Sequence, residues 1–257
     1  GLDSQYTLIL IDGFPLIGRS AGTLDINRLT VGNIEQIEII KGASSSLYGN
    51  EALGGVINIV TKTAKEGAST QMDWRQASYG TSDLSIQGNY KQKALAAQLF
   101  TNRYNSQGYR LNSSSVLPTV EPFENTTLQA KVSYHFSEQT SVGINARLYN
   151  QHQDLSFSET QKGESETEEW NLGIKLDHRF NKQWNAYFEL YSTAFIAEEY
   201  LNTPSKAALN YFDQRFVRPE LRVHYNNEKN QSIIFGLGTT HESLYRTNFT
   251  TKPVFDA

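Results

Sequence analysis

The most versatile side chains in this chain are its five histidines, which could serve as metal ligands, as general bases or as part of a catalytic triad. They are His135, His152, His178, His224 and His241, and they lack the short ligand spacings that are typical of zinc sites. There is no Gly-x-Ser-x-Gly motif, and no serine, histidine and acidic residue form a recognisable set. The absence of cysteine excludes disulfides, iron–sulfur ligation and thiol catalysis within the chain. The sequence therefore predicts no enzyme, no cofactor and no metal site.

Two other segments have compositions that can bind small ligands. Residues 42–55 are rich in glycine and serine, but they lack the Gly-Lys-Ser/Thr ending of a phosphate-binding loop. A strand pattern also follows them where such a loop requires a helix, so we expect their glycines to permit tight turns instead. Residues 164–169 form an acidic run, which we expect to be a solvated external face, with a cation or ligand site as the alternative.

Charge and hydropathy narrow the class of protein. The 257 residues include 23 basic and 27 acidic side chains, so the net charge of −4 gives no basic footprint for nucleic acid. The mean hydropathy is −0.50, and no stretch approaches the roughly 20 apolar residues of a membrane-spanning helix. A membrane barrel has a similarly low average, because only every second strand residue faces lipid. If the chain spans a membrane, it must therefore do so as a barrel.

Beyond its N-terminal part, the chain alternates apolar and polar residues with a period close to two, as strands with two different faces do. Leu128 and Ala130, for example, flank Gln129. The pattern places His135 and His224 on the polar face, where we expect them to line a lumen. Nine strands are predicted, at residues 71–79, 84–91, 94–103, 128–136, 140–152, 170–180, 184–197, 217–225 and 231–246.

The connections between these strands predict an orientation, because outer-membrane barrels have short periplasmic turns and long external loops. Short turns are predicted at residues 91–93, 137–139, 181–183 and 226–230, and long polar loops at residues 104–125, 153–164 and 200–210. Aromatic residues near the strand ends predict two belts at the membrane interfaces. The belt by the short turns comprises Tyr90, Tyr134, Phe136, Phe180, Trp184 and Tyr225, and the belt by the long loops comprises Phe100, Tyr104, Tyr149, Phe195 and Phe212.

The N-terminal part is organised differently. Strands are predicted at residues 6–11, 34–40 and 56–62, with a short helical turn at residues 25–32. Its motifs, in order, are Ile11-Asp12-Gly13, Ile37-Glu38-Ile39-Ile40-Lys41-Gly42, Leu47-Tyr48-Gly49, Ala52-Leu53-Gly54-Gly55 and Val56-Ile57-Asn58-Ile59. In these motifs the segment resembles the C-terminal half of the plug domain of TonB-dependent outer-membrane receptors. The resemblance covers residues 8–62 by motif and the rest of the chain by architecture only.

The resemblance implies a mainly β fold with two parts. Residues 1–66 would be the C-terminal part of the plug, and residues 67–257 the N-terminal part of an antiparallel transmembrane β-barrel. The nine strands would belong to a parent barrel of about 22 strands, the size of plugged outer-membrane transporters. We therefore expect the chain to be part of a longer protein, with further barrel strands after Ala257.

The resemblance also implies a function in the bacterial outer membrane. A receptor of this family binds a scarce nutrient outside and imports it through the plugged barrel, and a ferric siderophore or cobalamin is the favoured cargo. The implied partners are a small-molecule ligand such as a metal chelate, the lipid bilayer, and the periplasmic energy-coupling protein TonB, which binds a segment that is absent here. The alternative is a non-transporting binding, adhesion or signalling receptor on the same scaffold.

The implied ligand site is the loop that follows the first strand and its turn. In this family that loop lies at the plug apex and faces the incoming substrate. Arg19 and Ser20 would be its polar ligand contacts and Ile17 an apolar contact. Alternatively, Arg19 pairs with a carboxylate of the barrel wall, such as Asp73 or Glu189.

Overall fold

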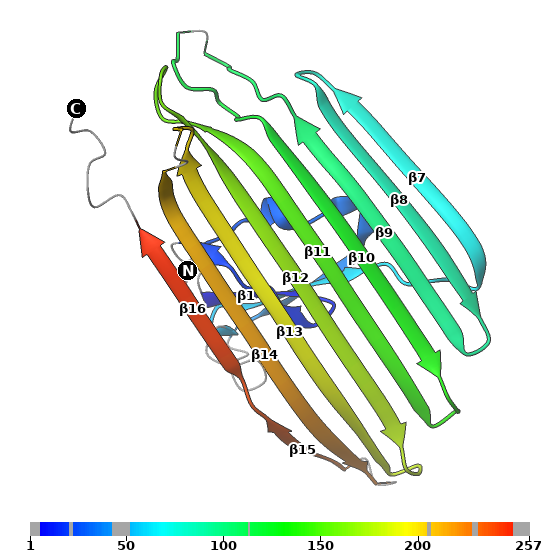
Figure 1. Cartoon of the computed structure of the whole chain (residues 1–257). Coiled ribbons are helices and arrows are strands. Elements are labelled where there is room, and N and C mark those ends of the chain that lie inside the picture. Colours follow the sequence, from blue (N-terminus) through cyan, green and yellow to red (C-terminus); the bar gives the residue numbers. More distant parts are fainter. Residues whose placement is uncertain are drawn as a thin grey trace. The chain divides into compact units, whose positions relative to one another are not determined.

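The computed structural model describes residues 6–20, 23–42, 52–112, 114–204, 207–227 and 231–248 (Figure 1). Its elements are almost all strands, so the predicted mainly β fold is confirmed. The chain divides into two compact units, Gly1–Ala64 and Lys65–Ala257. The predicted features at Leu47-Tyr48-Gly49 and after residue 248 lie outside the described residues. Within the described part of the chain, no helix is long and apolar enough to cross a membrane.

The first unit is built on a four-stranded sheet with the strand order β2-β1-β6-β5. Its strands are β1 (Thr7–Ile11), β2 (Phe14–Pro15), β5 (Ile34–Lys41) and β6 (Gly55–Thr61). Along β1, buried and half-buried residues alternate, and the buried Leu8 and Leu10 pack with Ala52 and Val56 in a small core. Strand β6 lies between β1, which is parallel to it, and β5, which is antiparallel.

A tight turn at Asp12 and Gly13 joins β1 to β2. The two residues have positive φ angles of 53° and 85°, a conformation that glycine adopts freely and aspartate tolerates. The Asp12 carboxylate accepts hydrogen bonds from the backbone amide of Thr61 (2.9 Å) and from its hydroxyl (2.8 Å). The Ile11-Asp12-Gly13 motif therefore ties the turn after β1 to the end of β6.

The predicted helical turn is present as two short 3-10 helices, at Ile26–Arg28 and Val31–Asn33. Three further elements were not predicted: β2, and the small hairpin of β3 (Arg19–Ser20) and β4 (Thr23–Leu24). Strands of two residues are too short to show a hydrophobic period, so the sequence carries no signal for them.

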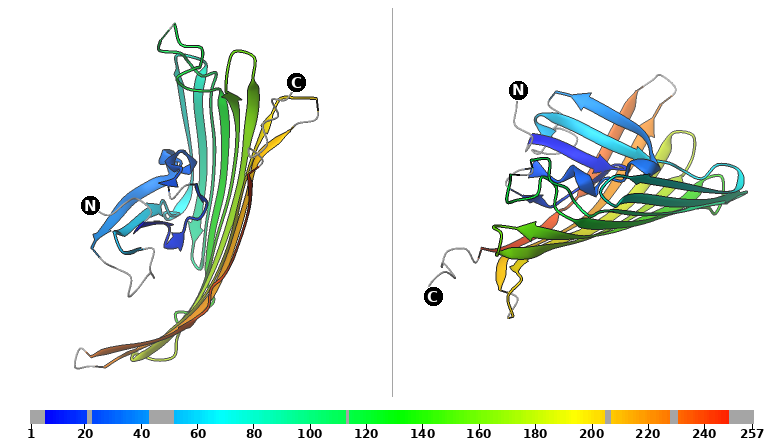
Figure 2. Two further views of the ribbon diagram at one scale, coloured as in Figure 1. Left: turned by 90° about the vertical axis from the view of Figure 1, so that its left-hand side faces the viewer. Right: turned by 90° about the horizontal axis from the view of Figure 1, so that it is seen from above.

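The second unit is one curved antiparallel sheet in which the strands from β7 to β14 follow chain order (Figures 1 and 2). The strands are β7 (Gly67–Ala77), β8 (Thr81–Gln92), β9 (Leu95–Ser106), β10 (Phe123–His135), β11 (Thr140–Ser156), β12 (Lys162–Arg179), β13 (Trp184–Leu201), β14 (Ala208–Asn226), β15 (Ser232–Gly238) and β16 (His241–Asn248). Both β15 and β16 pair with β14, along different parts of it. Together they correspond to the predicted ninth strand with a break at residues 239–240, so all nine predicted strands are present.

Two of the three predicted long loops are wrong. The connection at residues 107–122 is long, but those at residues 157–161 and 202–207 are short. The polar residues assigned to these loops instead continue the ladders of β11 with β12 and of β13 with β14. Backbone hydrogen bonds do not depend on side-chain polarity, so polar strand ends resemble loops in the sequence. The strands reach 19 residues in β14, well beyond the about 9–11 residues that cross a bilayer.

The sheet has a polar face and an apolar face. In adjacent cross-strand rows, Arg147 lies opposite Asn171 on the polar face and Leu148 lies opposite Trp170 on the apolar face. Large exposed side chains on the apolar face include Met72, Trp74, Ile86, Leu99, Leu128, Ile144, Trp170 and Leu221. Buried polar side chains on the other face include Gln87, Gln98, Asn102, Thr127, Gln129, Arg147, Glu169, Glu189 and Thr193. The exposed large side chains of this sheet are therefore apolar and its buried side chains are polar, which is the reverse of the pattern in a water-soluble sheet.

The apolar face forms a band of limited height. On β12 the band begins at Trp170, and it ends at Phe180, the residue just after the strand. This is about 33 Å along the strand at roughly 3.3 Å per residue. At a strand tilt of about 40° this corresponds to a height of roughly 25 Å, which is the height of the lipid-facing band of outer-membrane barrels.

Only one of the two predicted aromatic belts faces the expected side. The belt by the short turns lies on the apolar face, where Trp184 is opposite Tyr225 with ring centroids 4.7 Å apart. In the other set, Phe100 and Tyr149 are each 1% exposed and lie on the polar face, opposite Gln129 and Thr127. Tyr104, Phe195 and Phe212 share that face. Phe100 and Tyr149 also lie near the middle of β9 and β11 and not at a strand end. The predicted second belt at the membrane interface was therefore wrong.

Candidate functional site

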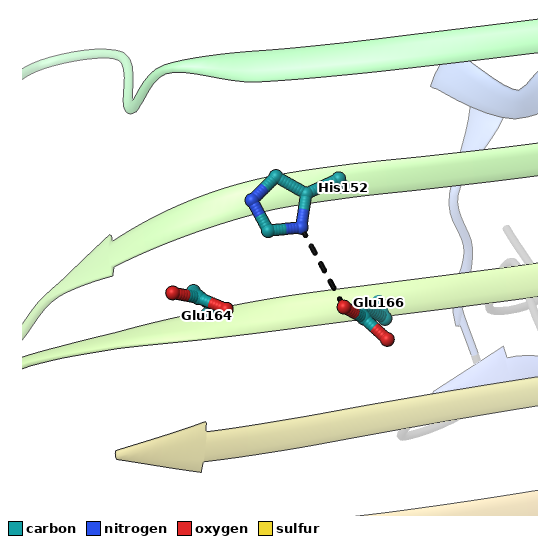
Figure 3. A group of neighbouring side chains, drawn as sticks. All are labelled: His152, Glu164 and Glu166. Atoms are coloured by element: carbon teal, nitrogen blue, oxygen red, sulfur yellow. Dashed lines mark ion pairs between the residues drawn. The ribbon is translucent and has the colours of Figure 1, made fainter. Parts of the chain in front are cut away.

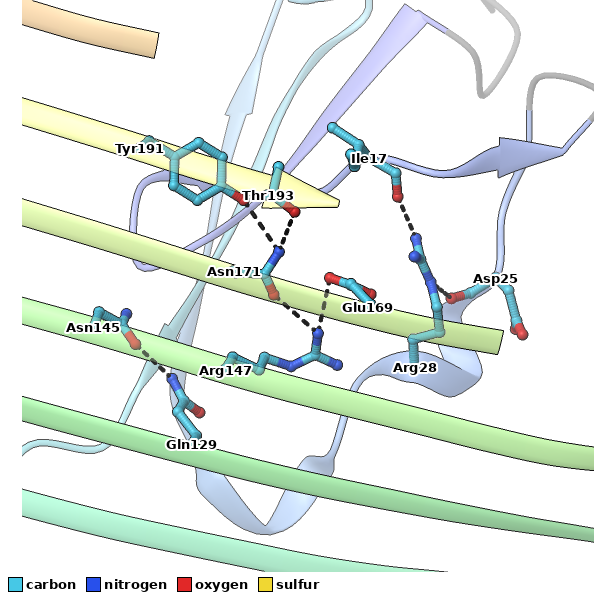
Figure 4. Close-up of polar contacts among 10 residues, drawn as sticks. All are labelled: Ile17, Asp25, Arg28, Gln129, Asn145, Arg147, Glu169, Asn171, Tyr191 and Thr193. Carbon is cyan, nitrogen blue, oxygen red and sulfur yellow. Dashed lines mark hydrogen bonds and ion pairs between the residues drawn. The ribbon is translucent and has the colours of Figure 1, made fainter. Parts of the chain in front are cut away.

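In the first unit, arginine side chains hold the loop that was predicted to contact ligand. Arg28 is 1% exposed, and its Nη2 donates a hydrogen bond to the carbonyl of Ile17 (2.7 Å). Its Nε donates to the carbonyl of Asp25 (3.4 Å), so the guanidinium bridges two parts of the loop (Figure 4). Arg19 Nη2 donates to the carbonyl of Thr7 (2.6 Å). These bonds fix the loop to the start of β1.

The three predicted contact residues have different surroundings. Ile17 is 7% exposed, Arg19 is half-buried, and Ser20 pairs with Thr23 in the β3–β4 hairpin. Their contact with ligand stays a prediction. Arg28 was not predicted as a structural residue of this loop, because an arginine in a short polar segment has the same sequence signature whether it is buried or solvated.

In the second unit, a buried ion pair lies at the centre of the polar face. Arg147 Nη1 donates to Glu169 Oε1 at 2.9 Å, and the two side chains are 6% and 0% exposed. The same nitrogen donates to Asn171 Oδ1 (3.3 Å), and Asn171 Nδ2 donates to Thr193 Oγ1 (2.7 Å) and Tyr191 Oη (3.3 Å). Figure 4 shows this network crossing three neighbouring strands, β11, β12 and β13. Charge-assisted hydrogen bonds of this kind fix side-chain positions.

A second group of charges lies further along the same face. Glu189, whose side chain is 9% exposed, forms ion pairs with Lys175 Nζ (3.1 Å) and Arg218 Nη2 (2.9 Å). Glu220 forms an ion pair with Arg222. Glu189, one of the two wall carboxylates considered for Arg19, is thus bound by two cations of the wall itself. The sequence placed these residues on the polar face but did not indicate which of them pair, because pairing depends on strand register.

The second unit also contains a cavity at the end that carries the long connection. Its volume is about 610 Å³, within the about 300–1,000 Å³ of typical ligand pockets. The lining is mainly polar and includes Arg110, Glu121, Asp154, Ser156, Lys162 and Asn202. Glu121 accepts hydrogen bonds from the amide (3.0 Å) and hydroxyl (3.2 Å) of Ser156, which join the long connection to β11. The cavity therefore presents both charge signs and several hydroxyls to a ligand.

Comparison with known proteins identifies the first unit. Residues 1–56 match the family model of the TonB-dependent receptor plug domain. This range contains the tight turn at Asp12, the loop around Arg28 and most of the four-stranded sheet.

Solved structures with a similar fold include the ferric enterobactin receptor PfeA from Pseudomonas aeruginosa, with 17% identity and a TM-score of 0.71 over 93% of this chain and 41% of that one. The siderophore receptor PiuA from Acinetobacter baumannii has 12% identity and a TM-score of 0.69, over 95% and 38% of the two chains. The ferripyoverdine receptor of the outer membrane of Pseudomonas aeruginosa has 12% identity and a TM-score of 0.73, over 97% and 38%.

The chain thus spans about two fifths of the length of these receptors. At such low identities the likeness establishes the fold, in which the second unit is part of a barrel wall. The chain thus combines a segment that matches the plug domain of TonB-dependent receptors with a sheet that has the fold of the barrel wall in these outer-membrane receptors.

Proposed function

We propose that the full-length protein imports a ferric siderophore across the bacterial outer membrane. The observation that carries the proposal is the plug domain at residues 1–56, followed by a wall whose fold is that of receptors for ferric enterobactin and ferripyoverdine. On this proposal, residues 1–66 are the C-terminal part of the plug and residues 67–257 the N-terminal part of the barrel. The protein binds and moves its ligand and catalyses no reaction.

The energy source follows from the plug. The match to plug domains implies a gate that must open, so import requires the plug to change its arrangement after ligand has bound outside. We propose that TonB supplies this energy through a segment that precedes the plug. Ferric siderophore is preferred to cobalamin because the solved structures with this fold include receptors for ferric enterobactin and ferripyoverdine.

We propose two sites of ligand contact. The first is the plug loop, where Arg19 and Ser20 offer polar contacts and Ile17 an apolar one. Support comes from the hydrogen bonds of Arg19 and Arg28 to backbone carbonyls, which preorganise this loop. The second is the polar cavity at the long-loop end, whose size suits a small chelate.

The test is uptake of radiolabelled ferric siderophores by iron-starved cells with and without the gene. The proposal expects accumulation that requires the gene and stops when a protonophore removes the proton gradient. Equal accumulation in both strains for every siderophore class would contradict it. Binding at the surface without accumulation would instead identify the non-transporting receptor.

A further inference from the structure

A histidine and two glutamates come together on the apolar-face side of β11 and β12, beyond the end of the apolar band (Figure 3). His152 lies opposite Glu166 in the strand register, and Glu164 lies two residues before Glu166 on the same face. They follow Leu148 and Trp170 towards the long-loop end, about 13 Å further along the strands at roughly 3.3 Å per residue. The cluster therefore lies above the lipid-facing band, in contact with water.

The geometry of the cluster suits a shared ion. One ligand atom from each of His152, Glu164 and Glu166 lies within 4.8 Å of the others. His152 Nδ1 is 3.8 Å from Glu166 Oε1, and its Nε2 is 3.8 Å from Asp154 Oδ1. These separations are too long for hydrogen bonds. They are close to the roughly 3.5 Å between two ligands that each lie about 2.1 Å from a tetrahedral metal ion.

The charges around the cluster are unbalanced. Glu166 lies directly opposite Glu198 on β13, and like charges in this arrangement destabilise a sheet. Among the described residues, no lysine or arginine forms an ion pair with Glu164, Glu166 or Glu198. A bound cation would reverse the repulsion. The imidazole distinguishes this group from an ordinary acidic surface, because it adds a nitrogen ligand between carboxylates.

We propose that His152, Glu164 and Glu166 bind a divalent transition metal of the Zn²⁺ class. Imidazole nitrogen favours such ions, whereas Ca²⁺ and Mg²⁺ prefer oxygen ligands alone. Three protein ligands leave a fourth position for water or an anionic oxygen. The sequence predicted no metal site, because the ligands come from two strands and their spacing along the chain does not match a known motif. The proposed site agrees with the alternative given for residues 164–169, a cation site in place of a solvated external face.

The experiment is a Zn²⁺ titration of the full-length protein in detergent, in competition with a chromophoric chelator. His152→Ala is expected to remove one Zn²⁺ per chain, and Glu166→Gln, which keeps the side-chain shape, to weaken binding at least about tenfold. Two matched controls should bind like the wild type. Glu168→Gln changes the next carboxylate on the same strand and face, and His178→Ala changes a histidine at the other end of the band. The heat-dependent gel mobility of each variant checks that its barrel is folded.

Three results would overturn the proposal. The first is wild-type Zn²⁺ binding by both His152→Ala and Glu166→Gln. The second is an equal loss in the two controls, which would place the ion elsewhere. The third is displacement of Zn²⁺ by Ca²⁺ or Mg²⁺ at similar concentration, which would show that the imidazole is no ligand.

Discussion

Replacing Arg147 by methionine should destabilise the barrel wall by about 3–5 kcal/mol, the usual effect of breaking a buried ion pair. Its guanidinium lies 2.9 Å from Glu169, and the side chains are 6% and 0% exposed. With an effective dielectric constant of about 20, the attraction at this distance is roughly 6 kcal/mol. Part of it offsets the cost of taking both charges out of water. Removing the arginine removes the attraction but leaves the carboxylate buried.

Two further variants separate this reasoning from a simple loss of packing. The double change Arg147→Met with Glu169→Gln removes both charges, so most of the lost stability should return. Arg103→Met is the matched control, because Arg103 pairs with Glu124 at 2.8 Å but with side chains that are 62% and 46% exposed. Breaking an exposed pair should change the free energy of unfolding far less, because solvent screens the two charges.

The assay is urea unfolding of the full-length protein in lipid vesicles, with heat-dependent gel mobility as the measure of the folded barrel. If Arg147→Met lowers the free energy of unfolding no more than Arg103→Met does, burial does not strengthen this pair. If the double variant is at least as unstable as the single one, the effect comes from lost contacts and the electrostatic reasoning is refuted.

Two other substitutions test the plug and the lipid-facing band. Gly55→Ala should destabilise the plug by about 2 kcal/mol or more, since φ is +129° and the new Cβ would lie 2.5 Å from a β5 carbonyl oxygen. The measurement is the protease resistance of the plug, which should fall for Gly55→Ala. It should not fall for Gly88→Ala, because a Cβ added at Gly88 has no atom within 4 Å. Equal resistance of the two variants would show that the β5 backbone moves to accommodate the new methyl group. Ile144→Lys places a charge inside the apolar band and should lower the unfolding free energy by about 2–4 kcal/mol, whereas Asn150→Lys, on the same face beyond the band, should lower it by about 0–1 kcal/mol. Equal effects of the two lysines in urea titrations would show that the band does not face lipid.

The sequence predicts the strands of the second unit well because several of them carry a long period-two pattern, as around Leu128 and Gln129. It predicts their ends poorly. The residues before Glu169 on β12 are acidic and resemble a loop, yet they extend the ladder with β11. A strand end is set by where the neighbouring backbone stops pairing, and one strand alone does not contain that information.

The contacts between side chains also depend on the neighbouring strand and not on one strand alone. The period placed Arg147 on the polar face, whereas Glu169 was expected on a solvated external face and is buried. Their contact requires the register of two paired strands. His152 and Glu166 meet for the same reason. In the plug, Asp12 was found by its motif, while its bonds to Thr61 depend on a parallel pairing between strands that are distant in the chain. The hydrophobic period thus predicts which face of the sheet a side chain lies on, whereas the contacts between side chains depend on the register of the paired strands.

The division of each wall strand between an apolar and a polar face has a consequence for how the protein is made. Along the chain, apolar residues such as Leu148 are separated by polar ones. A nascent segment therefore contains no continuous hydrophobic stretch that the machinery for inserting helices into the inner membrane could recognise. The same residues form a lipid-facing surface only after neighbouring strands have paired. A single strand entering lipid would carry bare backbone groups, each costing several kcal/mol. Biogenesis must therefore keep the chain unfolded through the periplasm, and couple pairing and insertion in one concerted step.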